Sequence, residues 1–239
     1  MYSLGFYFNG KHSNDMGLVI KTESNPLFPK KRIEMETVMG KDGAYTFEGS
    51  YNNKTLKFRC VLLESDMITR RLLARNLSEW LSSKGDLILD YEPDKKYIVT
   101  QTVNDIDLIL ENVYDTFSIA FEVMPQQYSV NNQSISLDNP TSQIGIFYSG
   151  NYKALPLLEV TGTGNISITT NGKTFTYTGL TGTIYIDCDH CLVYSGNKPK
   201  VNKLANFNGD FIQLKNGLNT IDLTGTITNI KIKFNNTYI

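Results

Sequence analysis

The most recognisable candidate for chemistry is the run Cys188-Asp189-His190-Cys191. Two thiolates at this spacing can bind Zn²⁺ or exchange as a redox pair. A structural zinc site needs four ligands, however, and the third cysteine, Cys60, is far away in the sequence. A redox pair joins a strand to a helix, whereas strand-like residues stand on both sides of this run. The run therefore predicts a turn between strands at 183–187 and 192–194, with Cys188 and Cys191 as a minor candidate for a metal site.

Residues suited to acid–base or nucleophilic catalysis are few. The chain has two histidines, His12 and His190, and no serine in a Gly-x-Ser-x-Gly pattern. His12 falls in the polar stretch 9–15, which predicts a surface loop with no partner to orient the imidazole as a base. The sequence therefore predicts no catalytic histidine or serine.

Neighbouring carboxylates occur in three pairs, and we expect all three in solvated turns. A glycosidase needs two carboxylates that face each other across a cleft, which sequence neighbours do not show. The pairs are Glu92 with Asp94, Asp105 with Asp107, and Asp187 with Asp189. They are the only support for an enzyme such as a cell-wall hydrolase.

Two glycine-containing runs match nucleotide-binding loops only in part. Residues 162–167 read Gly-Thr-Gly-Asn-Ile-Ser, so Ser167 stands where a dinucleotide loop has its third glycine. No helix follows whose N-terminus could bind a pyrophosphate, so we expect a tight β-turn. The run 40–43 lacks the spacing of a phosphate-binding loop. The sequence therefore predicts no cofactor.

Strands must position almost all of these residues. In 56–62, 117–123 and 230–234 apolar side chains alternate with others, and this period of two puts them on one face of a sheet. Asn-Gly pairs between such runs predict tight turns, because both residues tolerate a positive φ. We interpret the recurring Thr-Gly pairs as turns too; they begin at Thr161, Thr178, Thr181 and Thr224.

One segment, at about 66–84, follows a helical period instead. Its apolar residues recur every three to five positions and form a stripe that we expect to pack on a sheet. Ser65 or Asp66 can cap its start, Gly85 can end it, and Arg70 lies outside the stripe. The stripe consists of Met67, Ile68, Leu72, Leu73, Leu77, Trp80 and Leu81.

Composition changes along the chain and predicts two domains. The stretch 125–143 is polar, and beyond it Thr, Gly and Asn become frequent without a helical pattern, which is typical of a β-sandwich. We therefore expect a mainly β protein, with a β-rich domain containing one helix over 1–130 and an antiparallel β-sandwich over 131–239. Tyrosines of the second domain are expected to fill its core or edge; they are Tyr148, Tyr152, Tyr177, Tyr185, Tyr194 and Tyr238.

Charge and hydropathy exclude several classes of partner. The formal net charge of -1 gives no bulk positive field, so we expect neither sequence-specific nucleic acid binding nor an anionic membrane as partner. The N-terminus lacks the pattern of a signal peptide, and no stretch of about 18 apolar residues could cross a membrane. Three cysteines do not make a disulfide framework, so we expect a protein that matures in a cytoplasm.

Short motifs over nearly the whole chain resemble those of one family. The opening carries Phe8-Asn9-Gly10-Lys11-His12-Ser13 and then Asp15-Met16-Gly17-Leu18, and residues 38–45 read Val-Met-Gly-Lys-Asp-Gly-Ala-Tyr. In their order and spacing the motifs resemble the distal tail proteins of long-tailed siphophages. Further motifs occur in the second half at 155–164, 171–172, 184–187, 209–214 and 217–221.

This resemblance implies a structural virion protein and not an enzyme. It implies that six copies of the N-terminal domain form a ring under the tail tube, and that the C-terminal domain is a galectin-like sandwich that points outward. The implied partners are the tail tube protein, a tail-associated fibre or lysin protein, and receptor-binding or other baseplate proteins. The implied location is the tail tip of the virion, after synthesis and assembly in the cytoplasm of a bacterial host.

A second interpretation stays open at this point. The tyrosines of the second domain, together with the galectin-like resemblance, are also compatible with a carbohydrate-binding module that contacts host cell-wall saccharide, because aromatic rings can stack on sugars.

Overall fold

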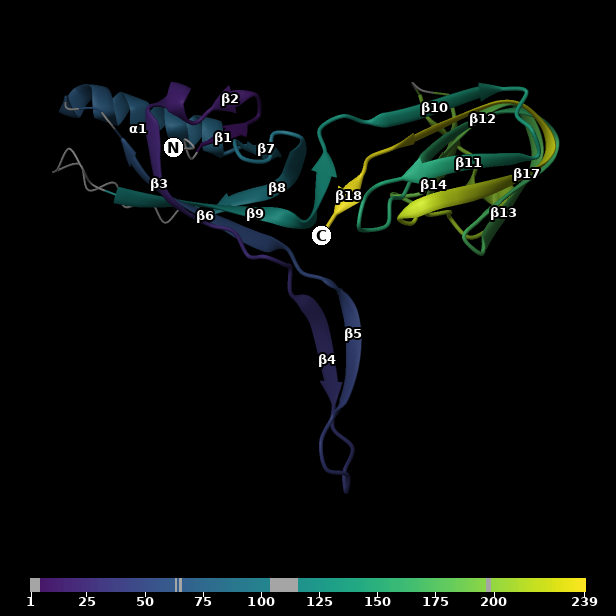
Figure 1. Ribbon diagram of the computed structural model, residues 1–239, viewed down its shortest axis with the longest axis horizontal. Coiled ribbons are helices and arrows are strands. Elements are labelled where there is room, and N and C mark those ends of the chain that lie inside the picture. Colours follow the sequence, from purple (N-terminus) through teal and green to yellow (C-terminus); the bar gives the residue numbers. More distant parts are fainter. Residues whose placement is uncertain (1–4, 63, 65, 104–115, 197–198) are drawn as a thin grey trace. The chain divides into compact units, whose positions relative to one another are not determined.

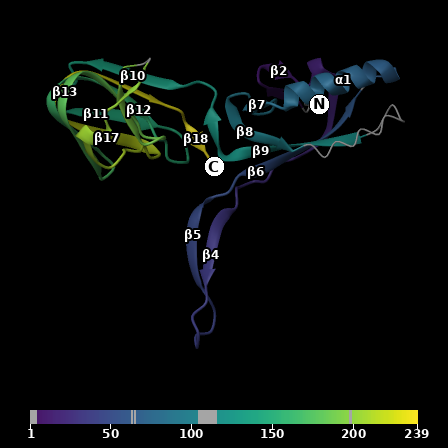
Figure 2. The same cartoon turned by 180° about the vertical axis from the view of Figure 1, so that it is seen from behind.

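The computed structural model describes residues 5–62, 64, 66–103, 116–196 and 199–239. The chain divides into two compact units, Met1–Gln127 with Ile239 and Tyr128–Tyr238 (Figure 1, and from behind in Figure 2). Each unit has its own hydrophobic core. The expected fold class, a mainly β protein with one helix and a β-sandwich, is confirmed for the described residues.

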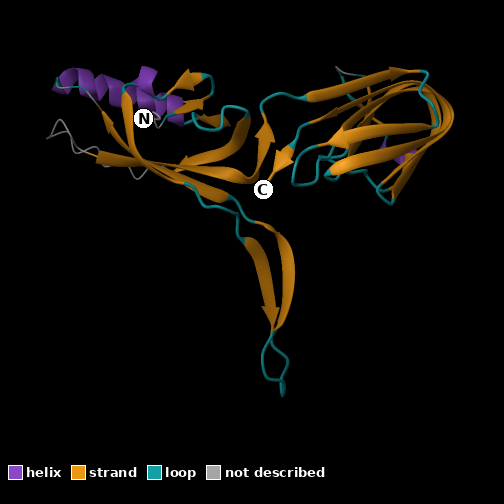
Figure 3. Ribbon diagram, viewed as in Figure 1, coloured by secondary structure: helices purple, strands orange, loops and turns teal. Residues whose placement is uncertain are grey.

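The first unit contains a sheet, a helix and a separate two-stranded hairpin (Figure 3). In the larger sheet the strands of this unit are hydrogen-bonded in the order β2-β1-β7-β8-β9-β6-β3, and β4 pairs with β5 alone among the described residues. The elements are β1 (Phe6–Phe8), β2 (Lys11–His12), the 3-10 turn η1 (Asn14–Met16), β3 (Leu18–Ser24), β4 (Lys31–Glu36), β5 (Tyr45–Tyr51), β6 (Lys54–Leu62), α1 (Met67–Leu81), β7 (Gly85–Leu89), β8 (Lys95–Val103) and β9 (Thr116–Ser129).

Alternating side chains form the core of this unit, as the period of two predicts. In the antiparallel pair β6–β9, Phe58 lies opposite Ile119, and both side chains are buried. The short strand β1 joins this sheet to the helix. The rings of Phe6 and Trp80 stack at 5.9 Å between centroids, and the indole N–H of Trp80 donates to the carbonyl oxygen of Phe8 at 2.9 Å.

The helix is confirmed, but the stripe is buried over its second half only. Leu77, Trp80 and Leu81 are buried, whereas Met67, Ile68 and Leu72 are exposed. Arg70, expected outside the stripe, is buried, and its guanidinium donates to the carbonyl oxygen of Glu64 at 2.9 Å. The prediction that the whole stripe packs on the sheet is wrong, because the N-terminal part of α1 has no described neighbour that covers it.

The ends of α1 also differ in part from expectation. Asp66 is the N-cap, and its carboxylate accepts from the backbone N–H of Thr69 at 2.8 Å. This hydrogen bond, together with one from the Thr69 hydroxyl, lowers the pKa of Asp66. Ser82, and not Gly85, ends the helix. Gly85 instead begins β7, where an added Cβ would lie 1.6 Å from Asn9 Oδ1. No helix of the described residues is long and apolar enough to span a membrane.

The second unit is a β-sandwich in which three strands are unusually long. Its strands are ordered β10-β17-β12-β13-β14-β15, with β11 paired to β17 and β16 paired to β13. The elements are β10 (Gln133–Asp138), β11 (Gln143–Tyr148), β12 (Leu157–Thr170), β13 (Lys173–Asp187), β14 (Leu192–Ser195), β15 (Val201–Asn202), the 3-10 turn η2 (Leu204–Asn206), β16 (Phe207–Gly209), β17 (Gly217–Phe234) and β18 (Thr237–Tyr238).

The Thr-Gly pairs lie inside these long strands, and not in turns. β12, β13 and β17 have 14, 15 and 18 residues and curve over the core of their unit (Figure 1). At the bend their backbones approach closely: a Cβ on Gly162 would lie 2.2 Å from the carbonyl oxygen of Thr226. The register shifts beside Gly162 and again between Gly164 and Ile166. The prediction of turns at these pairs and at 162–167 is therefore wrong, because a bulge and a close strand crossing need glycine as much as a turn does.

Candidate assembly surface

The turn predicted at the cysteine pair is confirmed, since β13 ends at Asp187 and β14 begins at Leu192. Burial raises the pKa of the Cys188 thiol to about 12, which disfavours the thiolate that a metal would need. Cys191 is exposed, and His190 Nδ1 lies 3.0 Å from Asp187 Oδ2. The described residues contain no group of three or more His, Cys, Asp or Glu side chains that could hold a metal. Among the described residues, Cys188 and Cys191 therefore have no further ligands that would complete a zinc site.

His12 does not lie in a surface loop, and that prediction is wrong. It ends the short strand β2, and its side chain is only 14% exposed. The Nε2 atom lies 3.1 Å from Asp90 Oδ1, and Nδ1 accepts from the backbone N–H of Asn14 at 3.2 Å. Nδ1 must then be unprotonated, so Nε2 carries the proton that is donated to Asp90. Both ring nitrogens serve to hold the N-terminal strands in place, and neither is left to act as a base.

The carboxylate pairs do not converge on a cleft where the structure describes them. Glu92 Oε2 accepts from Gln127 Nε2 at 2.8 Å, and Asp94 lies 3.3 Å from Lys95 Nζ on the surface. Asp189 is exposed in the turn after β13. The pair Asp105 and Asp107 lies outside the described residues.

The tyrosines of the second unit are largely occupied within it. Tyr148 and Tyr177 are buried in the core. Tyr148 Oη donates to the carbonyl oxygen of Tyr152 at 2.7 Å. Tyr185 and Tyr194 stack on each other at 5.2 Å between centroids. This placement agrees with the expected role in core and edge.

The most unusual surface belongs to the hairpin formed by β4 and β5. Nearly every residue of the two strands is exposed, and no other described element lies along either face in Figures 1 and 2. Both faces nevertheless carry large apolar side chains. Ile33 and Met35 project to one face, and Tyr45 and Phe47 to the other, in register with Glu36 and Glu34 respectively.

The tip of the hairpin continues this pattern. Met39 is fully exposed and Val38 is half exposed. Gly40 and Gly43 both have a φ of 83°, which fixes the turn geometry. Lys41 Nζ lies 3.6 Å from the centre of the Tyr45 ring, so these two residues form a cation–π contact. The hairpin therefore presents apolar surface from base to tip. We refer to residues 31–51 as the apolar hairpin.

A buried lysine fixes the base of the apolar hairpin to the sheet. Lys54, the first residue of β6, is buried, and its ammonium group reaches three oxygens. These are Asn25 Oδ1 at 3.4 Å, the carbonyl oxygen of Pro26 at 3.4 Å and Tyr97 Oη at 3.3 Å. Three acceptors match the three N–H donors of an ammonium group. Burial lowers the pKa of Lys54, an effect that nearby Glu92 opposes.

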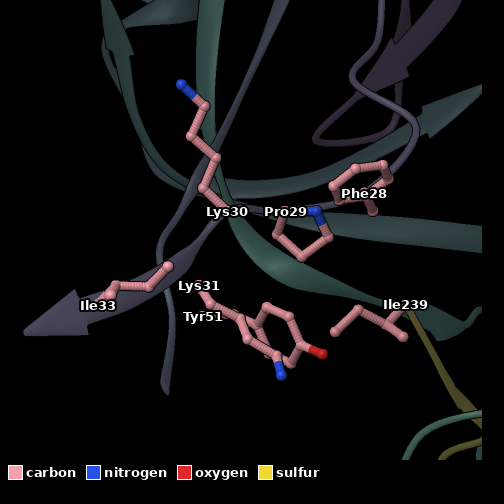
Figure 4. A pocket seen from close by; sticks show the side chains of 7 residues that line it. All are labelled: Phe28, Pro29, Lys30, Lys31, Ile33, Tyr51 and Ile239. Atoms are coloured by element: carbon pink, nitrogen blue, oxygen red, sulfur yellow. The ribbon is translucent and has the colours of Figure 1, made fainter. Parts of the chain in front are cut away.

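An apolar cavity of about 550 Å³ lies at the same base (Figure 4). Its lining consists of Phe28, Pro29, Lys30, Lys31, Ile33, Tyr51 and Ile239, and the ammonium group of Lys31 is paired with Glu48. Its volume is large enough for several side chains of another molecule. The hairpin and its base thus provide both protruding and concave apolar surface on one unit.

The apolar hairpin was not predicted from the sequence. Residues 31–36 and 45–51 alternate like half-buried strands, which is also the pattern of β6. One signal was present, since apolar residues such as Val38 and Met39 continue into a segment whose glycines predict a turn. Turns at a surface are normally polar, so apolar residues there indicate contact with another molecule.

Comparisons with known proteins agree on the kind of molecule. A model of the phage tail protein RIFT-related domain family matches residues 5–123, which contain the sheet, the helix and the apolar hairpin. The chain belongs to this phage tail protein family. The resemblance to siphophage distal tail proteins is thereby confirmed. Comparison with curated proteins found no match.

Solved structures share the fold across both units. The Dit protein of phage SPP1, described as a paradigm of hub adsorption apparatus in phages that infect Gram-positive bacteria, superposes with a TM-score of 0.75 at 14% identity and 100% coverage of both chains. A chain of the phage P2 baseplate in its activated conformation with Ca superposes with a TM-score of 0.52 at 10% identity and 98% coverage of each. At these identities the likeness concerns the fold. Together with the family, it supports a structural role in a phage tail or baseplate.

Proposed function

We propose that this protein forms a six-membered ring, a hub at the distal end of a phage tail that joins the tail tube to the baseplate. The observation that carries the proposal is the apolar hairpin. Large apolar side chains on both faces of a two-stranded element have no described neighbour, and a two-stranded hairpin alone is marginally stable in water. Such a surface is stable and soluble when another chain covers it.

The contact that fits this surface is heterologous. The apolar hairpin of one copy packs against the hairpin base of the next, where the cavity lined by Phe28, Ile33 and Tyr51 accepts apolar side chains. A head-to-tail contact of this kind generates a ring when the rotation between copies closes. Two observations agree with a hub: the phage tail protein family of residues 5–123, and the fold shared with the Dit hub protein of phage SPP1.

Other partners follow from the position of a hub. The ring contacts a tail tube protein on one side and a tail-associated fibre or lysin protein on the other. The second unit contacts receptor-binding or other baseplate proteins. On this proposal the protein acts by assembly, which the phage tail protein family of residues 5–123 supports. It is assembled in the bacterial host and resides at the tail tip.

The mass and shape of the purified protein test the ring. Light scattering should give six times the mass of one 27.0 kDa chain, and negative-stain images should show rings with six-fold symmetry. The tail tube protein should increase the fraction of chains in rings. A protein that stays monomeric at high concentration, with and without its tail partners, would contradict the proposal.

A further inference from the structure

One strand of the second unit has an open edge. Among the described residues, β11 pairs with β17 on one side and with no strand on the other. Natural edge strands are protected by charged residues, proline, bulges or covering loops. β11 reads Gln-Ile-Gly-Ile-Phe-Tyr and pairs without a register shift, so it has neither charge, proline nor bulge. Its backbone can therefore accept a further strand.

An exposed apolar pair lies on the outer face beside this edge. Phe147 and Leu218 are register partners on β11 and β17, and their side chains are 73% and 72% exposed. Gly145 is two residues before Phe147 and faces the same side. A Cβ added to Gly145 would lie 3.5 Å from Leu218 Cδ1, so Leu218 forms one wall of a notch at the glycine. The edge strand thus carries a protruding ring and a notch side by side.

We propose that this edge binds a second copy of the chain, with the two β11 strands antiparallel and Ile146 on the two-fold axis. In this register Phe147 of one copy lies opposite Gly145 of the other. Directly opposed residues of an antiparallel pair face the same side, so each Phe147 ring fills the notch beside Leu218 of the other copy. Ile144 and Tyr148 are then opposite each other on the inner face, where both side chains already belong to the core.

The pattern favours a second copy because one surface supplies both halves of the contact. The protrusion and the notch are two residues apart on one strand, and the two-fold axis superposes each on its complement. Among the register partners of β11 on β17, the charged residue is Asp222. Asp222, which faces Gln143, accepts a hydrogen bond from Gln143 Nε2 at 2.8 Å. One six-residue strand pair with two aromatic rings is a small interface, so the association is weak and depends on concentration.

This contact is independent of the proposed ring. It uses the second unit, whereas the ring uses the apolar hairpin of the first. An isologous contact cannot close a six-membered ring by itself, so it joins either two unassembled chains or two rings. The two proposals can therefore be tested separately in a variant of the protein that cannot form rings.

Sedimentation velocity of the full chain with Met39→Ser and Phe47→Ser tests the contact. With rings abolished, this protein should shift from 27.0 kDa toward twice that mass as its concentration increases to about 1 mM, the upper range of weak association. Adding Phe147→Ser, or Gly145→Val to fill the notch, should weaken dimerisation at least tenfold. Leu192→Ser, which changes an exposed leucine away from β11, is the matched control and should leave the dimer intact.

Hydrogen exchange identifies the surface in the same samples. The backbone amides of β11 should exchange more slowly at high than at low concentration, and this difference should vanish in the Phe147→Ser protein. A protein that remains monomeric throughout would overturn the proposal and leave the edge to a different protein. A dimer that survives both β11 substitutions, or protection confined to another segment, would overturn it equally.

Discussion

Two β-hairpins of this protein, one in each unit, differ in what they bury. In the second unit, β12 and β13 bury alternate side chains such as Ile168 and Phe175 beneath them. In the first unit, β4 and β5 have a similar alternation but bury almost nothing. The same alternation therefore has a buried face in the second unit and no buried face in the first. Alternation therefore does not ensure a covered face within the chain, and we propose that another copy covers the hairpin of the first unit.

Stability follows the same division. Burial of apolar side chains supplies the main free energy of folding, at roughly 25 cal/mol per Å². The long hairpin of the second unit gains this energy within the chain, whereas the apolar hairpin would gain it in the proposed ring. Substitutions in the apolar hairpin should therefore change the free energy of unfolding much less than substitutions in the two cores.

The largest expected effect is at the bend of the long strands. Gly162→Val places a side chain 2.2 Å from the carbonyl oxygen of Thr226, and the backbones must separate. We expect a loss of about 4 kcal/mol in the free energy of unfolding of the second unit, or failure to fold. Gly164→Ala is the control, because nothing lies within 4 Å of its Cβ and only its φ of 80° opposes the change. It should cost about 1 kcal/mol in urea unfolding, and equal losses would show that the bend is not tightly packed.

The next effect distinguishes the two halves of α1. Trp80→Ala removes the ring that stacks on Phe6 and the indole donor to Phe8, and should destabilise the first unit by about 3–5 kcal/mol. Ile68→Ala, on the exposed half, should change the free energy of unfolding by less than about 0.5 kcal/mol. Thermal and urea unfolding measure both. A comparable loss at Ile68 would mean that the N-terminal half of the stripe is covered within the chain.

A smaller effect is expected at the base of the apolar hairpin. Lys54→Met leaves the oxygens of Asn25 and Pro26 without their donor, which should cost about 1–3 kcal/mol at pH 7. Burial lowers the folded-state pKa of Lys54 below its unfolded value, so the unfolded chain holds the proton more tightly. Wild-type stability relative to Lys54→Met should therefore rise as the pH increases through the folded-state pKa toward 10.5. Urea unfolding between pH 7 and about 10 measures the difference, and a constant or falling difference would contradict the burial of a charged lysine.

Local period was enough to predict the strands but not which of them are covered. Residues 54–60 and 31–36 both alternate and both pair with another strand, yet only the first contribute side chains to a core that includes helix residues. Burial depends on neighbours that are distant in the sequence, so the alternation alone could not separate them. The same limit applies to Ile68, whose place in the helical stripe was correct and whose burial was not.

Glycine patterns were equally ambiguous. The pair Asn171-Gly172 is a tight turn between β12 and β13, with φ values of 52° and 77°. Gly162 and Gly225, in contrast, lie inside strands where another backbone passes closely. A turn favours glycine because of its positive φ, and a close crossing needs glycine because no side chain fits, so the sequence alone does not distinguish the two reasons. His12 was missed for a related reason, because its partner Asp90 comes from a distant turn.

Substitutions on the apolar hairpin test the proposed contact between copies. The double substitution Met39→Ser and Phe47→Ser changes two exposed side chains, so the free energy of unfolding should move by less than about 1 kcal/mol. Light scattering of this variant beside the wild-type protein should show that the six-fold mass is lost while the fold is kept. Leu192→Ser serves as the control and should retain the ring. A variant that still forms six-membered rings would contradict the account, because the apolar hairpin would then not be the contact between copies.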